Sequence, residues 1–152
     1  MPDSFAPWSS KTEPDHTLFV AHAKRLIAQG CDGVALLGTT GEANSFSLAQ
    51  RKVLLDVTVE AGIAPEKLMP GTGVAAMIDL TKHALSLGVN TVVMLPPFYY
   101  KGVTDDGLFA AYSEVIERIG DARLRVVLYH SLGVVRRLGG HLFVAVHVLS
   151  LH

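Results

Sequence analysis

The feature that most constrains the fold is a series of four short apolar runs separated by longer segments with helical periodicity. The runs cover residues 33–37, 68–71, 91–95 and 125–129. Short apolar runs bounded by turn residues are typical of strands that are buried on both faces. Helices that connect such strands make right-handed crossovers, so consecutive strands run parallel. The sequence therefore predicts an α/β fold built on a parallel sheet.

The segments between the runs contain recognisable helix boundaries. Asp15 is a good N-cap for a first helix that ends near Gln29, and Ser47 with Gln50 forms a capping-box pattern that opens a second helix. A third helix is expected over about 76–87, and a fourth opens near Thr104. The apolar stripe of the fourth helix has a period of 3.6 residues and consists of Leu108, Phe109, Tyr112, Val115, Ile116 and Ile119.

A polar turn, Gly-Thr-Thr-Gly-Glu at residues 38–42, follows the first apolar run. In α/β proteins ligands bind at the carboxyl ends of the strands. Gly38 and Gly41 let the backbone approach a ligand, while the hydroxyls of Thr39 and Thr40 and free N–H groups form a small anion cradle. A carboxylate fits such a cradle as well as a phosphate. The alternative is a tight turn in which the threonines make only capping hydrogen bonds.

Composition excludes several classes of function. The 152 residues are 49% hydrophobic and 18% charged, which fits one folded domain with a buried sheet. The net charge of −1 with no basic stripe argues against a nucleic-acid partner, and no apolar run reaches transmembrane length. We therefore expect no membrane partner and a cytoplasmic location. A single cysteine, Cys31, allows neither a disulfide nor a zinc pattern, and no metal or cofactor is expected.

Three motifs together resemble one enzyme family. The turn at 38–42, Pro-Pro-Phe-Tyr-Tyr at 96–100 and Leu-Tyr-His at 128–130 are similar to motifs of the dihydrodipicolinate synthase and N-acetylneuraminate lyase family, over roughly Pro7 to His130. The resemblance implies a lyase of the class I aldolase type, which holds pyruvate as a Schiff base and condenses it with, or cleaves it from, an aldehyde. It also implies a (β/α)₈ TIM barrel and a homo-oligomer. A complete barrel takes ~250 residues, so we expect an incomplete N-terminal part with about strands one to five.

The resemblance also implies roles for individual residues. Thr40 matches the residue that binds the pyruvate carboxylate, and Thr39 matches the hydroxyl that links two tyrosines into a proton relay. Tyr129 matches the tyrosine that moves protons to and from the bound intermediate. Tyr100 matches the second relay tyrosine, which reaches into a neighbouring subunit, although the register between Tyr99 and Tyr100 stays open. Each tyrosine could instead be a packing or interface residue.

The Schiff-base lysine is the missing element. In the family it lies on strand six, beyond the position of Tyr129, whereas every lysine of this chain precedes the fourth run: Lys11, Lys24, Lys52, Lys67, Lys82 and Lys101. Two readings follow: a pyruvate aldolase or lyase acting on pyruvate and an aldehyde or keto acid, or a non-catalytic fragment of that family. A third reading, a free-standing anion-binding module, would leave the strands at the two sheet edges unpaired.

The sequence changes character after His130. Residues 131–152 contain no Asp, Glu, Lys, Asn or Pro, and four of the seven histidines fall at or after His130. We therefore divide the chain into a partial TIM-barrel aldolase domain at 1–130 and a divergent tail at 131–152. A shifted reading frame is the preferred explanation of the tail, and a genuine but divergent helix or strand is the alternative. His141 and His147 lack accompanying carboxylates, so they make a poor metal site.

Overall fold

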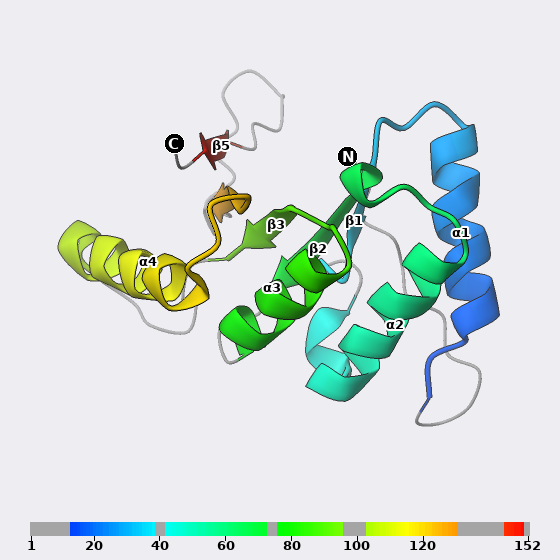
Figure 1. Ribbon diagram of the computed structural model, residues 1–152, viewed down its shortest axis with the longest axis horizontal. Helices are drawn as coiled ribbons and strands as arrows, with labels where there is room; N and C mark the ends of the chain where they lie inside the picture. Colours follow the sequence, from blue (N-terminus) through cyan, green and yellow to red (C-terminus); the bar gives the residue numbers. More distant parts are fainter. Residues whose placement is uncertain (1–12, 39–41, 73–75, 96–102, 131–144, 151–152) are drawn as a thin grey trace, which may run out of the picture.

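The computed structural model describes residues 13–38, 42–72, 76–95, 103–130 and 145–150 (Figure 1). Strands and helices alternate along most of this chain, as the sequence predicts. In order, the elements are α1 (His16–Ala28), β1 (Val34–Leu36), the 3₁₀ turn η1 (Ala43–Ser45), α2 (Leu48–Glu60), the 3₁₀ turn η2 (Pro65–Lys67), β2 (Leu68–Thr72), α3 (Met77–Ser86), β3 (Thr91–Met94), α4 (Asp105–Ile119), β4 (Arg125–His130) and β5 (Ala145–Ser150).

The sheet has the strand order β1-β2-β3-β4-β5. The first four strands are parallel, with Val34 opposite Leu68 and Thr91 opposite Arg125. These strands coincide, to within two residues at either end, with the four apolar runs, so the predicted parallel sheet is confirmed. Because all four strands point the same way, their carboxyl ends lie along one edge of the sheet.

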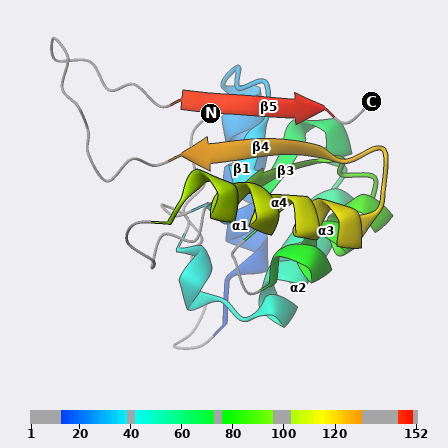
Figure 2. The same ribbon diagram turned by 90° about the vertical axis from the view of Figure 1, so that its left-hand side faces the viewer.

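The fifth strand departs from this pattern. β5 runs antiparallel to β4, with His130 opposite Ala145 and Arg125 opposite Ser150, and Figure 2 shows the two arrows pointing in opposite directions. A barrel would continue with another parallel strand after a crossover helix. The expectation that the 125–129 strand has an unpaired edge was therefore wrong, because β5 supplies backbone partners along that edge.

The helix boundaries follow from local capping chemistry. The Asp15 carboxylate accepts a hydrogen bond from the Leu18 N–H at 2.9 Å. The Ser47 hydroxyl accepts from the Gln50 N–H at 3.2 Å, while the Gln50 side chain accepts from the Ser47 N–H at 2.9 Å. The N-caps predicted for α1 and α2 are therefore confirmed. The predicted start of α4 near Thr104 is also confirmed, and the Thr104 hydroxyl accepts a hydrogen bond from the Gly107 N–H in its first turn.

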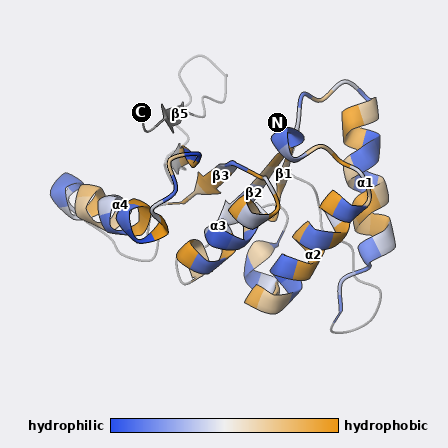
Figure 3. Ribbon diagram, viewed as in Figure 1, coloured by the Kyte–Doolittle hydropathy of each residue, from blue (hydrophilic) through white to orange (hydrophobic). Residues whose placement is uncertain are grey.

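The core lies between the helices and the sheet. The helices follow one another in chain order, and the hydropathy colouring shows apolar and polar patches alternating along them (Figure 3). Each of the first three helices buries apolar residues against β1–β3, and each fully buried leucine or phenylalanine side chain contributes about 1.5–3 kcal/mol. The largest fully buried side chains include Phe19, Leu36, Leu54, Leu55, Leu68, Leu80, Met94, Val34 and Val92.

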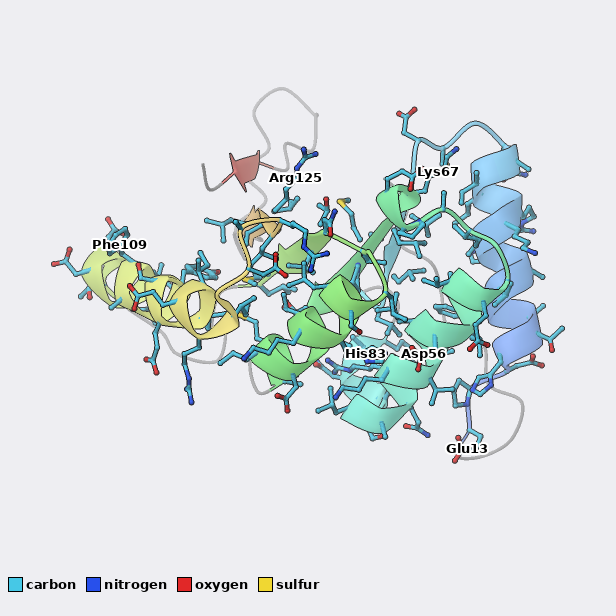
Figure 4. All side chains as sticks on the ribbon, in the orientation of Figure 1. Glu13, Asp56, Lys67, His83, Phe109 and Arg125 are labelled. Atoms are coloured by element: carbon cyan, nitrogen blue, oxygen red, sulfur yellow. The ribbon has the colours of Figure 1, made fainter. Side chains whose placement is uncertain are left out.

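Helix α4 is buried less than its periodic apolar stripe predicts. Ile119 is its one buried residue, and Phe109 near the amino end is 76% exposed (Figure 4). In Figure 1 α4 extends away from α1 and α2, and it packs mainly against α3 among the described helices. In the helix layer of a barrel each helix normally packs between two others. The apolar stripe of α4 is wide enough for two neighbouring helices and is therefore only partly covered.

Candidate functional site

Two of the predicted site residues, Gly38 and Tyr129, lie at the carboxyl ends of different strands. β1 ends one residue before Leu37 and Gly38, and Tyr129 lies at the carboxyl end of β4. The backbone therefore brings Gly38 and Tyr129 to the same edge, although three inter-strand steps separate them, or roughly 14 Å along a flat sheet. Curvature of the sheet toward a barrel would shorten that separation.

Most of the predicted site residues lie outside the described part of the chain. Thr39, Thr40, Gly41 and Tyr100 belong to the ranges 39–41 and 96–102, so their placement is not tested. Gly38 is half-buried at the end of the β1 strand. The described backbone thus places Gly38 and the end of β4, whereas the turn itself and the roles of the side chains stay predictions.

Strained backbone flanks the Gly-Thr-Thr-Gly turn on both sides. Leu37 has φ +56° and Glu42 has φ +54°, and they are the only non-glycine residues with positive φ in the part of the chain that the structure describes. A residue other than glycine pays roughly 1–2 kcal/mol for a left-handed conformation. Such outliers persist when surrounding packing holds them, and they cluster at functional sites. Leu37 is only 2% exposed, so its side chain is held by the core.

Strand β2 lies unusually close to the end of β1. A Cβ atom added at Gly71 would lie 2.6 Å from the Leu37 carbonyl oxygen and 3.1 Å from the Leu37 carbonyl carbon. Glycine is therefore required at residue 71 for the two strands to approach this closely. The next residue, Thr72, is fully buried, and its hydroxyl donates to the Val93 carbonyl at 3.2 Å. This end of β2 thus supports the turn after β1 and leaves the Thr72 hydroxyl engaged with the sheet.

Arg51 is a buried cation that contacts Ala43, the first residue of η1. It lies in the first part of α2, is 7% exposed, and donates a hydrogen bond from Nη2 to the Ala43 carbonyl oxygen. Burial lowers the pKa of the Arg51 guanidinium. Its Nε has no hydrogen-bond partner, and Arg51 forms no ion pair with any described residue. Nothing in the sequence signals this role, since an arginine after a capping box is usually a surface residue of the helix.

The described lysines lie away from the strands. Lys24 and Lys82 are exposed on α1 and α3, and Lys52 is half-buried on α2. Lys67, which Figure 4 labels, belongs to η2. Lys67 directly precedes β2, which places it at the amino edge of the sheet, opposite the candidate site. Lys11 and Lys101 lie outside the described residues. None of the four described lysines is therefore positioned on a strand at the carboxyl edge.

Two kinds of feature are absent from the described residues. No group of three or more His, Cys, Asp or Glu side chains in these ranges is arranged to hold a metal ion. None of the helices in the same ranges combines the length and the apolar character needed to cross a bilayer.

Comparison with known proteins identifies the family. The sequence profile of the dihydrodipicolinate synthetase family matches residues 2–134. The chain is 34% identical over 128 residues to an uncharacterized DapA-like lyase of Chloroflexus aurantiacus, covering 82% of this chain and 42% of the relative. It is 29% identical over 136 residues to the 4-hydroxy-tetrahydrodipicolinate synthase of Rhizobium meliloti, covering 88% of this chain and 45% of the relative.

A solved structure agrees with the sequence comparisons. The crystal structure of dihydrodipicolinate synthase from Agrobacterium tumefaciens superposes with a TM-score of 0.75 at 35% identity, covering 83% of this chain and 46% of that enzyme. The chain thus spans less than half the length of these relatives. Its four parallel strands and their helices correspond to an incomplete (β/α)₈ barrel. From the profile match over residues 2–134 and this shared architecture, the chain belongs to the dihydrodipicolinate synthetase family, whose members include lyases.

Proposed function

We propose that this chain carries the carboxylate-binding side and the proton relay of a pyruvate aldolase site. The observation that carries the proposal is the family match over residues 2–134, which includes the turn after β1 and the end of β4. The parallel direction of β1 and β4 supports it, because both segments then reach the same edge of the sheet. The reaction class is the condensation or cleavage of pyruvate with an aldehyde or keto acid, in the cytoplasm and in a homo-oligomer.

Each residue of the proposed site has a defined chemical task. Thr40 binds the pyruvate carboxylate through its hydroxyl and its backbone N–H, and the neighbouring glycines leave room for the ligand. Thr39 connects Tyr129 and Tyr100 in a relay. A phenol suits this role because it both donates and accepts a proton within hydrogen-bond reach.

The printed sequence supplies this site without an evident nucleophile. A lysine attacks a carbonyl only as the free amine, and proteins reach that state near neutral pH by burial or by neighbouring charge. The four described lysines lie on helices or in η2, away from the strands. We therefore infer that the chain as printed binds pyruvate without forming a Schiff base, which corresponds to the reading as a non-catalytic fragment.

We also propose that the chain consists of a partial barrel domain at residues 1–130 and a divergent, frame-shifted tail at residues 131–152. The antiparallel return of β5 differs from the parallel strand that a barrel would place next, which supports a different origin for residues 131–152. Sequencing of the gene across codon 130, translated in all three frames, tests this. A frame that restores a family-like strand with a lysine supports a shift, and the absence of such a strand from all three frames contradicts it.

Pyruvate titration monitored by amide NMR tests the proposed site. Pyruvate should shift the amide signals of Gly38, Glu42 and Ala43, and pyruvate methyl ester should not, because the carboxylate is the recognised group. Thr40→Val should weaken binding roughly tenfold, as expected for one hydrogen bond to a charged group. Thr17→Val, on the exposed surface of α1, is the matched control. Equal affinity of wild type and Thr40→Val, or binding of the ester, would contradict the proposal.

A further inference from the structure

Among the described residues, Arg51 is a charged side chain that is buried without a counter-charge. The residue is 7% exposed, yet among the described residues it has no ion-pair partner and its Nε atom has no hydrogen-bond partner. Burying a charged group without a counter-charge is costly, and arginine cannot escape the cost by giving up its proton. A helix that needed only to fill this space could do so with an apolar side chain of similar length.

The guanidinium holds one particular point of the backbone. Its Nη2 donates to the Ala43 carbonyl oxygen, which also accepts the Phe46 N–H at 3.2 Å to close η1. The Ala43 N–H in turn donates to the Gly38 carbonyl at 3.4 Å, across the turn. Arg51 is therefore attached to Ala43, the first residue of η1, which follows the turn that begins at Gly38.

The same contact places a positive charge at Ala43, close in the chain to the proposed anion cradle. Ala43 is two residues beyond Gly41, and Glu42 between them adopts the left-handed conformation at the exposed surface. In a poorly solvated region a fixed charge acts over a longer distance than in water. A carboxylate bound in the turn would therefore interact favourably with the Arg51 guanidinium without touching it.

We propose that Arg51 is a positioning residue of the anion-binding turn, which it holds through the Ala43 carbonyl and supports with a buried positive charge. This inference rests on the proposed function for its second half, the effect on pyruvate. Its first half, the attachment of η1, concerns the protein without a ligand. The competing explanation is that Arg51 only fills space between α2 and η1, in which case an apolar residue of equal length would serve equally well.

Amide hydrogen exchange on Arg51→Met and Arg51→Lys separates these explanations. Methionine keeps the length of the side chain without charge or donor, whereas lysine keeps both. Arg51→Met should speed exchange of the Ser45 and Phe46 amides roughly tenfold or more relative to wild type. The amides of Leu80 and Ala84 in α3 report global unfolding. The local effect is the change in the Ser45 and Phe46 exchange rates divided by the change in the Leu80 and Ala84 exchange rates. Arg51→Lys should restore much of the protection.

Pyruvate titration of the same proteins tests the contribution of the charge. Affinity should fall in Arg51→Met and recover in Arg51→Lys. Unchanged Ser45 and Phe46 exchange in Arg51→Met would overturn the positioning role, and equal pyruvate affinity in all three proteins would overturn the role of the charge. If wild type itself binds no pyruvate, the proposed function and the role of the charge both fail, while the exchange data still decide the positioning role. Should Arg51→Met not fold, Arg51→Leu against Arg51→Lys gives the same contrast, because leucine also lacks charge and donor.

Discussion

Replacement of Gly71 by alanine should separate β1 from β2 at the end that carries the candidate site. The new Cβ would lie 2.6 Å from the Leu37 carbonyl oxygen, 3.1 Å from the Leu37 carbonyl carbon and 3.4 Å from Gly38 Cα. All three neighbours are backbone atoms, so no side chain can rotate away. Reaching an ordinary carbon–oxygen contact requires a backbone movement of about 0.8 Å. Pro70, which pairs with Leu36, has no N–H to strengthen this part of the ladder.

The cost of this movement can be estimated and measured. Overpacking of a well-packed interior usually costs about 1–3 kcal/mol, and the upper half of that range applies because the clash is with backbone. Urea unfolding followed by circular dichroism should therefore show Gly71→Ala destabilised by about 2–3 kcal/mol with an unchanged denaturant slope. Pyruvate affinity should fall as well, because Gly38 moves with Leu37.

Gly107→Ala is the matched control for this prediction. Gly107 is exposed in the first turn of α4, and an added Cβ meets only side-chain atoms, the nearest being the Thr104 hydroxyl at 3.2 Å. Alanine also favours a helix over glycine by about 1 kcal/mol. The control should be neutral or stabilising. A Gly71→Ala protein within about 0.5 kcal/mol of wild type, a range usual for surface substitutions, would show that the two strands are not packed as described.

Four further predictions concern other contacts. The half-buried Asp56 carboxylate lies 2.7 Å from His83 Nε2 and joins α2 to α3 (Figure 4), so Asp56→Ala should lower the free energy of unfolding by about 0.5–1.5 kcal/mol in urea titrations at neutral pH. Burial raises the pKa of Tyr112 to about 12. The unfolded state loses this proton first, near pH 10, so stability should fall between about pH 10 and 12 in urea titrations, and less so in Tyr112→Phe. Glu42→Asn, at φ +54°, should raise stability by up to about 1 kcal/mol on thermal unfolding, because asparagine tolerates the left-handed region better. Phe109→Lys should change the free energy of unfolding in urea by less than about 0.5 kcal/mol, because the ring is 76% exposed. A larger loss would show that the Phe109 ring is buried.

The parts of the fold that the sequence predicts depend on short-range chemistry. The helix starts are predictable at Asp15, Ser47 and Thr104. Each of these side chains accepts a hydrogen bond from the backbone N–H three residues further along the chain. The four parallel strands follow from apolar runs alternating with such helices. The location of the candidate turn follows in the same way, because it directly succeeds a strand.

The remaining features depend on contacts that the local sequence does not encode. Leucine and glutamate rarely adopt positive φ, so nothing in the residue types at 37 and 42 signals the strained backbone around the turn. The burial of Arg51 depends on how α2 meets Ala43, and the exposure of Phe109 depends on which helices surround α4. The antiparallel pairing of β5 with β4 joins segments on either side of residues 131–144, which no periodicity rule specifies.

Borohydride reduction in the presence of pyruvate tests the central claim most directly, namely that this chain holds a pyruvate site without its nucleophile. The reduced protein is measured by intact mass spectrometry and then by peptide mapping, with a full-length dihydrodipicolinate synthase treated in parallel as the positive control. The full-length enzyme should become labelled, and this chain should show no stoichiometric adduct, because no described lysine lies on a strand at the carboxyl edge. A stoichiometric adduct that maps to one lysine, and that disappears when this lysine is replaced, would contradict the claim.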